Sequence, residues 1–134
     1  MSNTSSFKWQ VPIHSHVSIP CRRGIYNIAL SGLVLHDIPN TAANDILHVC
    51  ISPYAENTSV WLRGAHINSI KTIVRNSEKS TVFIQYQRDE LDFYKVDLTA
   101  NFNLFNVSVV DILGHGIPGT GFAVFELIAD NNCG

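Results

Sequence analysis

The stretch IYNIALSGLVL, residues 25–35, decides the fold class. Its apolar side chains fall on every second residue, first on even and then on odd positions: Tyr26, Ile28, Leu30, Leu33 and Leu35. Alternation with a period of two predicts a strand with one buried face. The single change of parity near Ser31 and Gly32 predicts a β-bulge, because one extra residue exchanges the two faces of a strand.

The same period recurs along most of the chain. Phe7, Trp9, Val11 and Ile13 alternate, and Pro12 between them indicates an edge strand. Further strands are predicted over residues 46–52, 60–62, 67–75, 81–87, 92–98, 105–112 and 122–128. Glycines and a proline over residues 114–121 predict a long turn between the last two strands, and residues 41–47 predict at most one helical turn. We therefore expect an all-β chain, a single jelly-roll-type β-sandwich of about eight antiparallel strands.

Length and charge limit the domain count and the classes of partner. The 134 residues predict one domain over 1–134, with residues 1–6 as a flexible N-terminal arm. Charged residues make up 15% of the chain, against about 25% in an average protein, while hydrophobic residues make up 46%. A net charge of −2 argues against direct nucleic-acid binding by bulk charge. Sparse charge favours a surface that other subunits cover.

Targeting signals and cysteine chemistry point to a cytosolic origin. The start MSNTSSFKWQ has no apolar core, so we expect no signal peptide, and no apolar run is long enough for a membrane span. Three cysteines without a CxxC spacing predict neither a disulfide framework nor a zinc site. Cys50 lies in an apolar run and is predicted to be a small buried hydrophobe.

Catalytic and cofactor signals are weak. His14 and His16 have the spacing at which two imidazoles of one strand face the same side, but no carboxylate ligand follows, so they are weak metal candidates. His48 alternates with Ile46 and Cys50 and is predicted to be a hydrogen-bonded sheet residue. Residues 88–92 hold the densest charge cluster and predict a solvated hairpin tip. We expect no enzyme activity and no cofactor.

Five residues are candidates for an interface. Aromatic residues are enriched at protein interfaces, and loops with glycine often carry function. The candidates are Phe7, Trp9, Tyr54, Trp61 and His115. For the aromatic residues, a place in the core is an equally good interpretation of the sequence.

Two segments, taken in order, resemble a known family. The first comprises SFKWQVP (6–12), GIYNIAL (24–30) and PNTAAN (39–44), and the second comprises FNVSVVDILG (105–114) and a closing strand that contains FEL (125–127). The chain thereby resembles the single-jelly-roll minor capsid and penton proteins of viruses with double-jelly-roll major capsids, which include polinton-like, virophage-like and adenovirus-like lineages. The resemblance implies a virion protein that oligomerises and packs against other capsid proteins, and it implies no catalytic residue.

Three functional hypotheses follow. The first is a viral structural protein, either a minor capsid or a capsid-associated jelly roll. The second is a sugar- or receptor-binding β-sandwich, similar to lectin or tumour-necrosis-factor domains, in which Tyr54, Trp61 and the His115 loop form the site. The third is a small cupin-like metalloprotein that uses His14 and His16.

Overall fold

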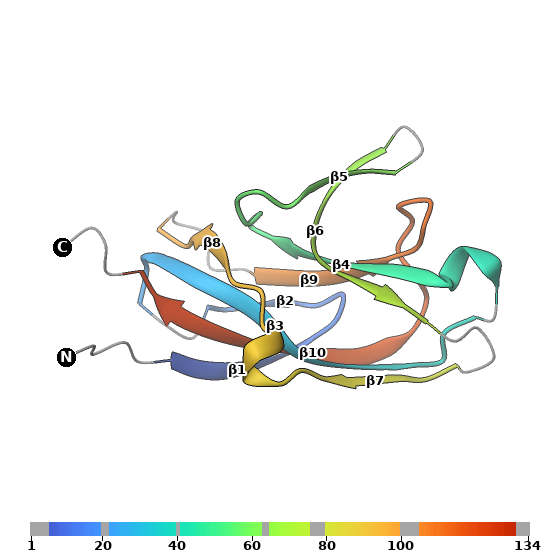
Figure 1. Ribbon diagram of the computed structural model, residues 1–134, viewed down its shortest axis with the longest axis horizontal. Helices are drawn as coiled ribbons and strands as arrows, with labels where there is room; N and C mark the ends of the chain where they lie inside the picture. Colours follow the sequence, from blue (N-terminus) through green and yellow to red (C-terminus); the bar gives the residue numbers. More distant parts are fainter. Residues whose placement is uncertain are drawn as a thin grey trace.

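Two antiparallel sheets of five strands each make up the described part of the protein (Figure 1). The computed structural model describes residues 6–19, 22–39, 41–62, 65–75, 80–99 and 105–130. Sheet I comprises β1 (Ser6–Pro12), β10 (Thr120–Ala129), β3 (Ile25–His36), β7 (Val82–Gln85) and β8 (Tyr94–Asp97). Sheet II comprises β2 (His16–Val17), β9 (Phe105–Val110), β4 (Ile46–Ser52), β6 (Ala65–Val74) and β5 (Ser59–Leu62). The all-β class predicted from the alternation is confirmed.

The strands pair in a nested order: the first pairs with the last, and each later strand pairs with one closer to the middle of the chain. β1 pairs with β10, β2 with β9, β3 with both β7 and β8, and β4 with β6. This order is that of a jelly roll with eight strand positions. The described residues form ten strands rather than eight for two reasons. β7 and β8 pair with different parts of β3 and together occupy one jelly-roll position, and β5 adds a hairpin partner to β6. Periodicity did not predict β2, which is only two residues long.

The predicted bulge in β3 is present. Gly32 pairs with Val124 while Leu30 pairs with Phe125, so Ser31 is the extra residue between them. The Ser31 hydroxyl donates to the Val124 carbonyl at 3.2 Å. The bulge keeps the apolar residues on both sides of Ser31 facing the core.

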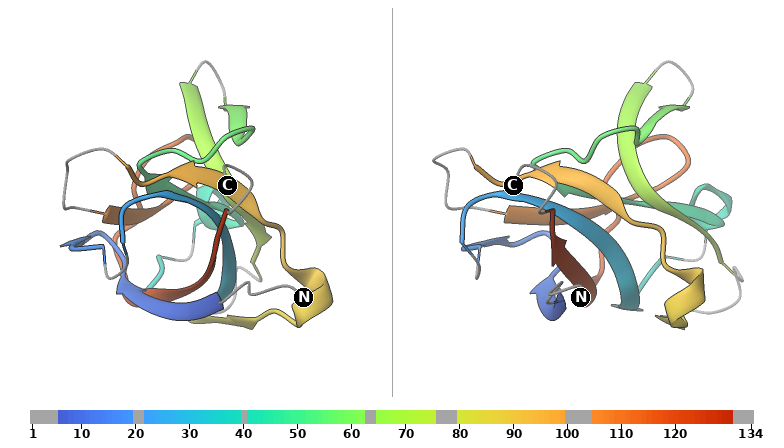
Figure 2. Two further views of the ribbon diagram at one scale, coloured as in Figure 1. Left: turned by 90° about the vertical axis from the view of Figure 1, so that its left-hand side faces the viewer. Right: turned by 60° about the vertical axis from the view of Figure 1, so that its left-hand side comes forward.

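The core lies between the sheets and is aromatic at its centre. The rings of Trp9 and Phe105 are 4.7 Å apart, and those of Phe105 and Phe125 are 5.6 Å apart and edge-on. Both views of Figure 2 show β1, β3 and β10 curving around this interior, while the hairpin of β5 and β6 projects away from it. Edge-to-face rings add specific packing energy to the apolar burial.

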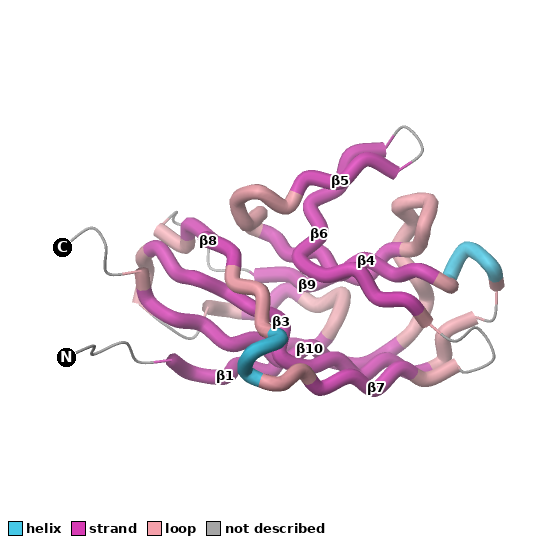
Figure 3. The backbone as a smooth tube through the Cα atoms, in the orientation of Figure 1, coloured by secondary structure: helices cyan, strands magenta, loops and turns pink. Residues whose placement is uncertain are grey.

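Helical structure is confined to two short 3₁₀ turns within the described residues (Figure 3). The first, η1 (Ala42–Asn44), is the single turn predicted for residues 41–47. Arg75, only 6% exposed, holds it by donating to the carbonyl oxygens of Asn44 at 2.8 Å and Pro39 at 3.1 Å. The described residues contain no helix with the length and apolar character that a membrane span requires.

The long turn before β10 is present, and it enters the strand through a glycine. Gly121 has φ +153°, and a Cβ atom at this position would lie 1.9 Å from the Val34 carbonyl oxygen. Only a residue without a side chain allows β10 to approach β3 this closely. Cys21, Cys133 and residues 1–5 of the predicted arm lie outside the described residues.

Candidate functional site

The outer face of sheet I carries a continuous apolar row. Register places Pro12 of β1, Phe122 of β10, Val34 of β3 and Phe83 of β7 side by side across four strands. Phe83 is 74% exposed, and Phe122 and Val34 are half-buried. These four residues are called the apolar row below. Val74 of β6, 81% exposed, shares a depression of about 170 Å³ with Phe83, so apolar surface continues past the edge of the sheet.

A hollow adjoins the apolar row. The next row across the same strands is Gln10, Val124, Gly32 and Gln85, and Gly32 contributes no side chain. The resulting hollow has a volume of about 220 Å³ and is also lined by Phe122 and Phe83. Sheet I therefore presents an apolar ridge beside an apolar depression, which suits a protein partner with a complementary surface.

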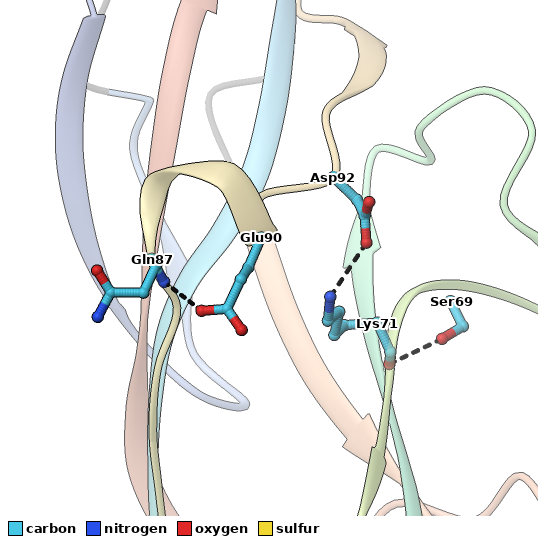
Figure 4. A network of polar contacts seen from close by, with 5 residues as sticks. All are labelled: Ser69, Lys71, Gln87, Glu90 and Asp92. Carbon is cyan, nitrogen blue, oxygen red and sulfur yellow. Dashed lines mark hydrogen bonds and ion pairs between the residues drawn. The ribbon is translucent and has the colours of Figure 1, made fainter.

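The turn between β7 and β8 is tied to both sheets. Arg88, in η2 (Arg88–Glu90), forms an ion pair with Glu126, whose side chain is only 4% exposed on β10. In Figure 4, Lys71 of β6 reaches Asp92 beyond the turn, with Nζ and Oδ2 3.0 Å apart. The Lys71 ammonium also lies 4.4 Å from the centre of the Tyr86 ring. The four charged residues of the predicted solvated tip, Arg88, Asp89, Glu90 and Asp92, are exposed as expected. The tip is not a simple hairpin, because β7 and β8 both pair with β3 and the Arg88 and Asp92 side chains contact neighbouring strands.

The outer face of sheet II has a different character, beginning with the β5–β6 hairpin. Register pairs Trp61 with His66 and Ser59 with Asn68, so these four side chains share one face of the hairpin. The rings of Trp61 and His66 are 5.1 Å apart, and His66 Nε2 lies 2.5 Å from the Ser59 hydroxyl. The Trp61 side chain, 74% exposed, therefore packs against the His66 imidazole, which is itself hydrogen-bonded to Ser59.

A polar depression lies at the foot of this hairpin, and it is called the sheet II hollow below. Its floor comes from two cross-strand pairs, Ser52 with Asn106 and Cys50 with Ser108. Tyr54, 68% exposed, and the hairpin residues complete the lining of a volume of about 260 Å³. The lining residues are Cys50, Ile51, Ser52, Tyr54, His66, Ile67, Asn68, Asn106, Ser108 and Val110.

Cys50 and His48 are two titratable groups of β4 on the sheet II outer face, and both are affected by burial. Burial raises the pKa of the Cys50 thiol to about 11, so Cys50 is a neutral lining group near pH 7. Cys50 is half-buried on the outer face, which differs from its predicted place as a buried hydrophobe. His48 is 5% exposed, with Nδ1 3.1 Å from the Thr72 hydroxyl and 3.3 Å from the Ser69 hydroxyl. The predicted role of His48 as a hydrogen-bonded sheet residue is confirmed.

The five interface candidates fall in three places. Phe7 and Trp9 are half-buried and pack against the core, as the alternative interpretation held. Tyr54 and Trp61 are exposed on sheet II, and His115 is exposed in the turn after β9, where its N–H donates to Asp111 Oδ1 at 3.0 Å. The structure brings Tyr54 and the hairpin to one hollow, but His115 does not line that hollow.

Sequence reasoning missed the apolar row. A signal for it exists, because the runs Val82-Phe83-Ile84 and Phe122-Ala123-Val124 place apolar residues on both parities of a strand. Such a run puts at least one apolar side chain on the outer face of a two-sheet sandwich. The polar floor of the sheet II hollow had no comparable signal, because Ser52 and Asn106 are far apart in sequence.

The histidine pair does not form the geometry that its spacing suggested. His14 lies in the turn between β1 and β2 with φ +59°, so His14 and His16 are not residues of one strand. His16 pairs with Asn106 and lies at the end of the polar floor. Among the described residues, no group of three or more His, Cys, Asp and Glu side chains is placed to hold a metal ion.

Comparisons with known proteins complete the description. A scan against protein-family models gave no match, and searches of curated proteins and of solved structures gave none either.

Proposed function

We propose that this chain is a virion structural protein, a minor capsid or capsid-associated jelly roll that oligomerises and packs against other shell subunits. The apolar row on sheet I is the observation that carries the proposal. Its side chains lie on the outer face of the sheet, outside the core between the two sheets, and Phe83 at its end is 74% exposed.

The energetics favour covering the apolar row with protein. Fully burying a Phe side chain stabilises a contact by about 2 kcal/mol, and Phe83 is 74% exposed in the free chain. Phe122, Val34 and Pro12 extend the row straight across the sheet. A row of this kind on an isolated protein promotes aggregation, whereas in a shell it faces a neighbour.

The charge distribution supports the same partner class. None of the four residues of the apolar row is charged, and Lys8 is the one charged residue among those lining the adjoining hollow. Interface centres are depleted in Lys, Glu and Asp, because each buried charge must lose its hydration. The occupant that fits is another shell subunit with an apolar patch, which includes a second copy of this chain.

Light scattering of the purified protein across a concentration series tests the proposal. We expect a mass that rises to a defined oligomer, or a stable complex with a capsid subunit encoded beside the gene for this chain. Phe83→Asp should abolish association without changing the thermal midpoint, because the side chain is exposed, and Glu56→Gln on an exposed loop is the control. A monodisperse monomer at high concentration, without affinity for capsid subunits, would contradict the proposal.

A further inference from the structure

We infer that the sheet II hollow binds a neutral saccharide unit on a polar floor of Asn106, Ser52 and Ser108. Its aromatic walls are Tyr54, which lines the hollow, and Trp61, which packs beside the lining residue His66. The inference does not depend on the shell role, because the hollow lies on the other sheet from the apolar row. Three features of the hollow select this ligand class: its aromatic walls, its uncharged polar lining and its size.

The two aromatic side chains of the proposed site are exposed in the free protein. Trp61 and Tyr54 are 74% and 68% exposed, although both ring systems carry a large apolar area that folded chains usually bury. The face of a saccharide ring presents C–H groups with partial positive charge, and the faces of aromatic rings are negative. His66 supports the Trp61 ring at 5.1 Å and is itself fixed through Ser59, so little freedom remains to be lost on binding.

The polar lining fits hydroxyl groups better than ions. Asn68 and Asn106 each offer amide donors and a carbonyl acceptor, while Ser52 and Ser108 offer hydroxyls that donate and accept. Saccharide hydroxyls likewise donate and accept. None of the described residues lining the hollow is Asp, Glu, Lys or Arg. An anionic sugar or a phosphate would therefore lose its hydration without gaining a charged partner.

The size of the hollow suits one ring. Its volume of about 260 Å³ lies just below the range of about 300–1,000 Å³ typical of small-molecule pockets. The remaining units of a longer glycan extend into solvent beside the hairpin of β5 and β6, which projects from the sandwich in Figure 1. Contacts with one unit predict modest affinity per chain, which an oligomer would multiply by avidity.

An array of immobilised neutral and acidic glycans tests the inference. We expect retention on a subset of neutral glycans, with Trp61→Ala and Tyr54→Ala each weakening binding about tenfold. The matched control is Phe83→Ala, which removes an equally exposed ring from sheet I and should leave glycan binding unchanged. Both wall residues are exposed, so thermal midpoints close to that of the parent chain verify that the variants fold.

Competition in solution then identifies the source of the saccharide unit. Inhibition by the free monosaccharide indicates a terminal unit, while inhibition only by the oligosaccharide indicates an internal unit of a polymer, and either result supports the site. Three results would overturn the inference: no retained glycan, retention of acidic glycans alone, or full binding by both wall variants. Loss of binding in Phe83→Ala would also overturn it, since the site would then lie on sheet I.

Discussion

The two outer faces of the sandwich differ although both sheets supply the same core. Sheet I shows the apolar row and an apolar hollow, whereas sheet II shows amides, hydroxyls and two exposed aromatic rings around a polar hollow. Inward residues of a strand are fixed by packing, but outward residues are free of that demand. Their composition is the basis of the two proposals, in which sheet I packs against a protein surface and sheet II binds a polar ligand.

Phe83 and Trp61 illustrate the difference between the two outer faces, although their side chains are equally exposed. Each is 74% exposed, and each lies on a short strand beside the long strands of its sheet. Phe83 continues a row of apolar neighbours, while the Trp61 ring packs against the His66 imidazole. Substitutions that change one face and leave the other intact test this contrast.

The largest effect is expected where the apolar row meets the glycine turn. Gly121→Ala should lower the free energy of unfolding by more than about 3 kcal/mol, because the new Cβ would lie 1.9 Å from the Val34 carbonyl oxygen and force β10 away from β3. Urea unfolding measures the change. Gly116→Ala is the control, since nothing lies within 4 Å of a Cβ at that position, and equal losses for the two variants would contradict the close approach.

A smaller effect is expected at the turn between β7 and β8, which Arg88 joins to β10. Arg88→Met should cost about 2 kcal/mol, because it leaves the buried Glu126 carboxylate without this partner. Adding Glu126→Gln should recover part of the loss, since a neutral amide is less costly to bury than an unpaired charge. Chemical denaturation of the two single variants and the double variant gives the coupling, and strict additivity would show that the ion pair does not hold the turn.

The smallest effect is expected in the pH dependence of stability, through His48 on sheet II. Burial lowers the pKa of His48 below its usual value near 6.5, so the unfolded chain takes up the proton first as the pH falls. The contribution of His48 to stability is therefore complete above pH 6.5 and declines below it, toward the lower pKa of the folded state. Replacing His48 with Gln should flatten the stability profile below about pH 6.5.

A second His→Gln substitution supplies the control. His36→Gln replaces an exposed side chain at the end of β3 and is measured beside His48→Gln under the same conditions. A His48→Gln profile as steep as that of the parent chain would place the titration elsewhere.

Much of the fold was predictable because alternation reports burial directly. The parity change at Ser31 predicted the bulge, and Pro12 predicted the edge position of β1. Pairing order was not predictable, because nested contacts join residues as distant as Ser6 and Ile128. Periodicity records which side of a strand is buried but not which strand lies next to it.

The candidate sites were less predictable, because they depend on that pairing. Tyr54 and Trp61 were identified by residue type alone, and the polar floor required knowing that Asn106 lies opposite Ser52. Cys50 was misplaced because both parities of residues 46–51 contain apolar residues, so the sequence did not show which one faces the core. Phe83 was missed although its apolar neighbours on both sides indicated an apolar outer face.

Oxidative footprinting of the assembled protein tests the separation of the two faces most directly. Phe83 and Trp61 are 74% exposed in the free chain, so mass spectrometry should find both modified before assembly. In the oligomer or shell, we expect protection of Phe83, while Trp61 stays reactive until a neutral glycan is added. Continued modification of Phe83 together with protection of Trp61 by assembly alone would contradict the account.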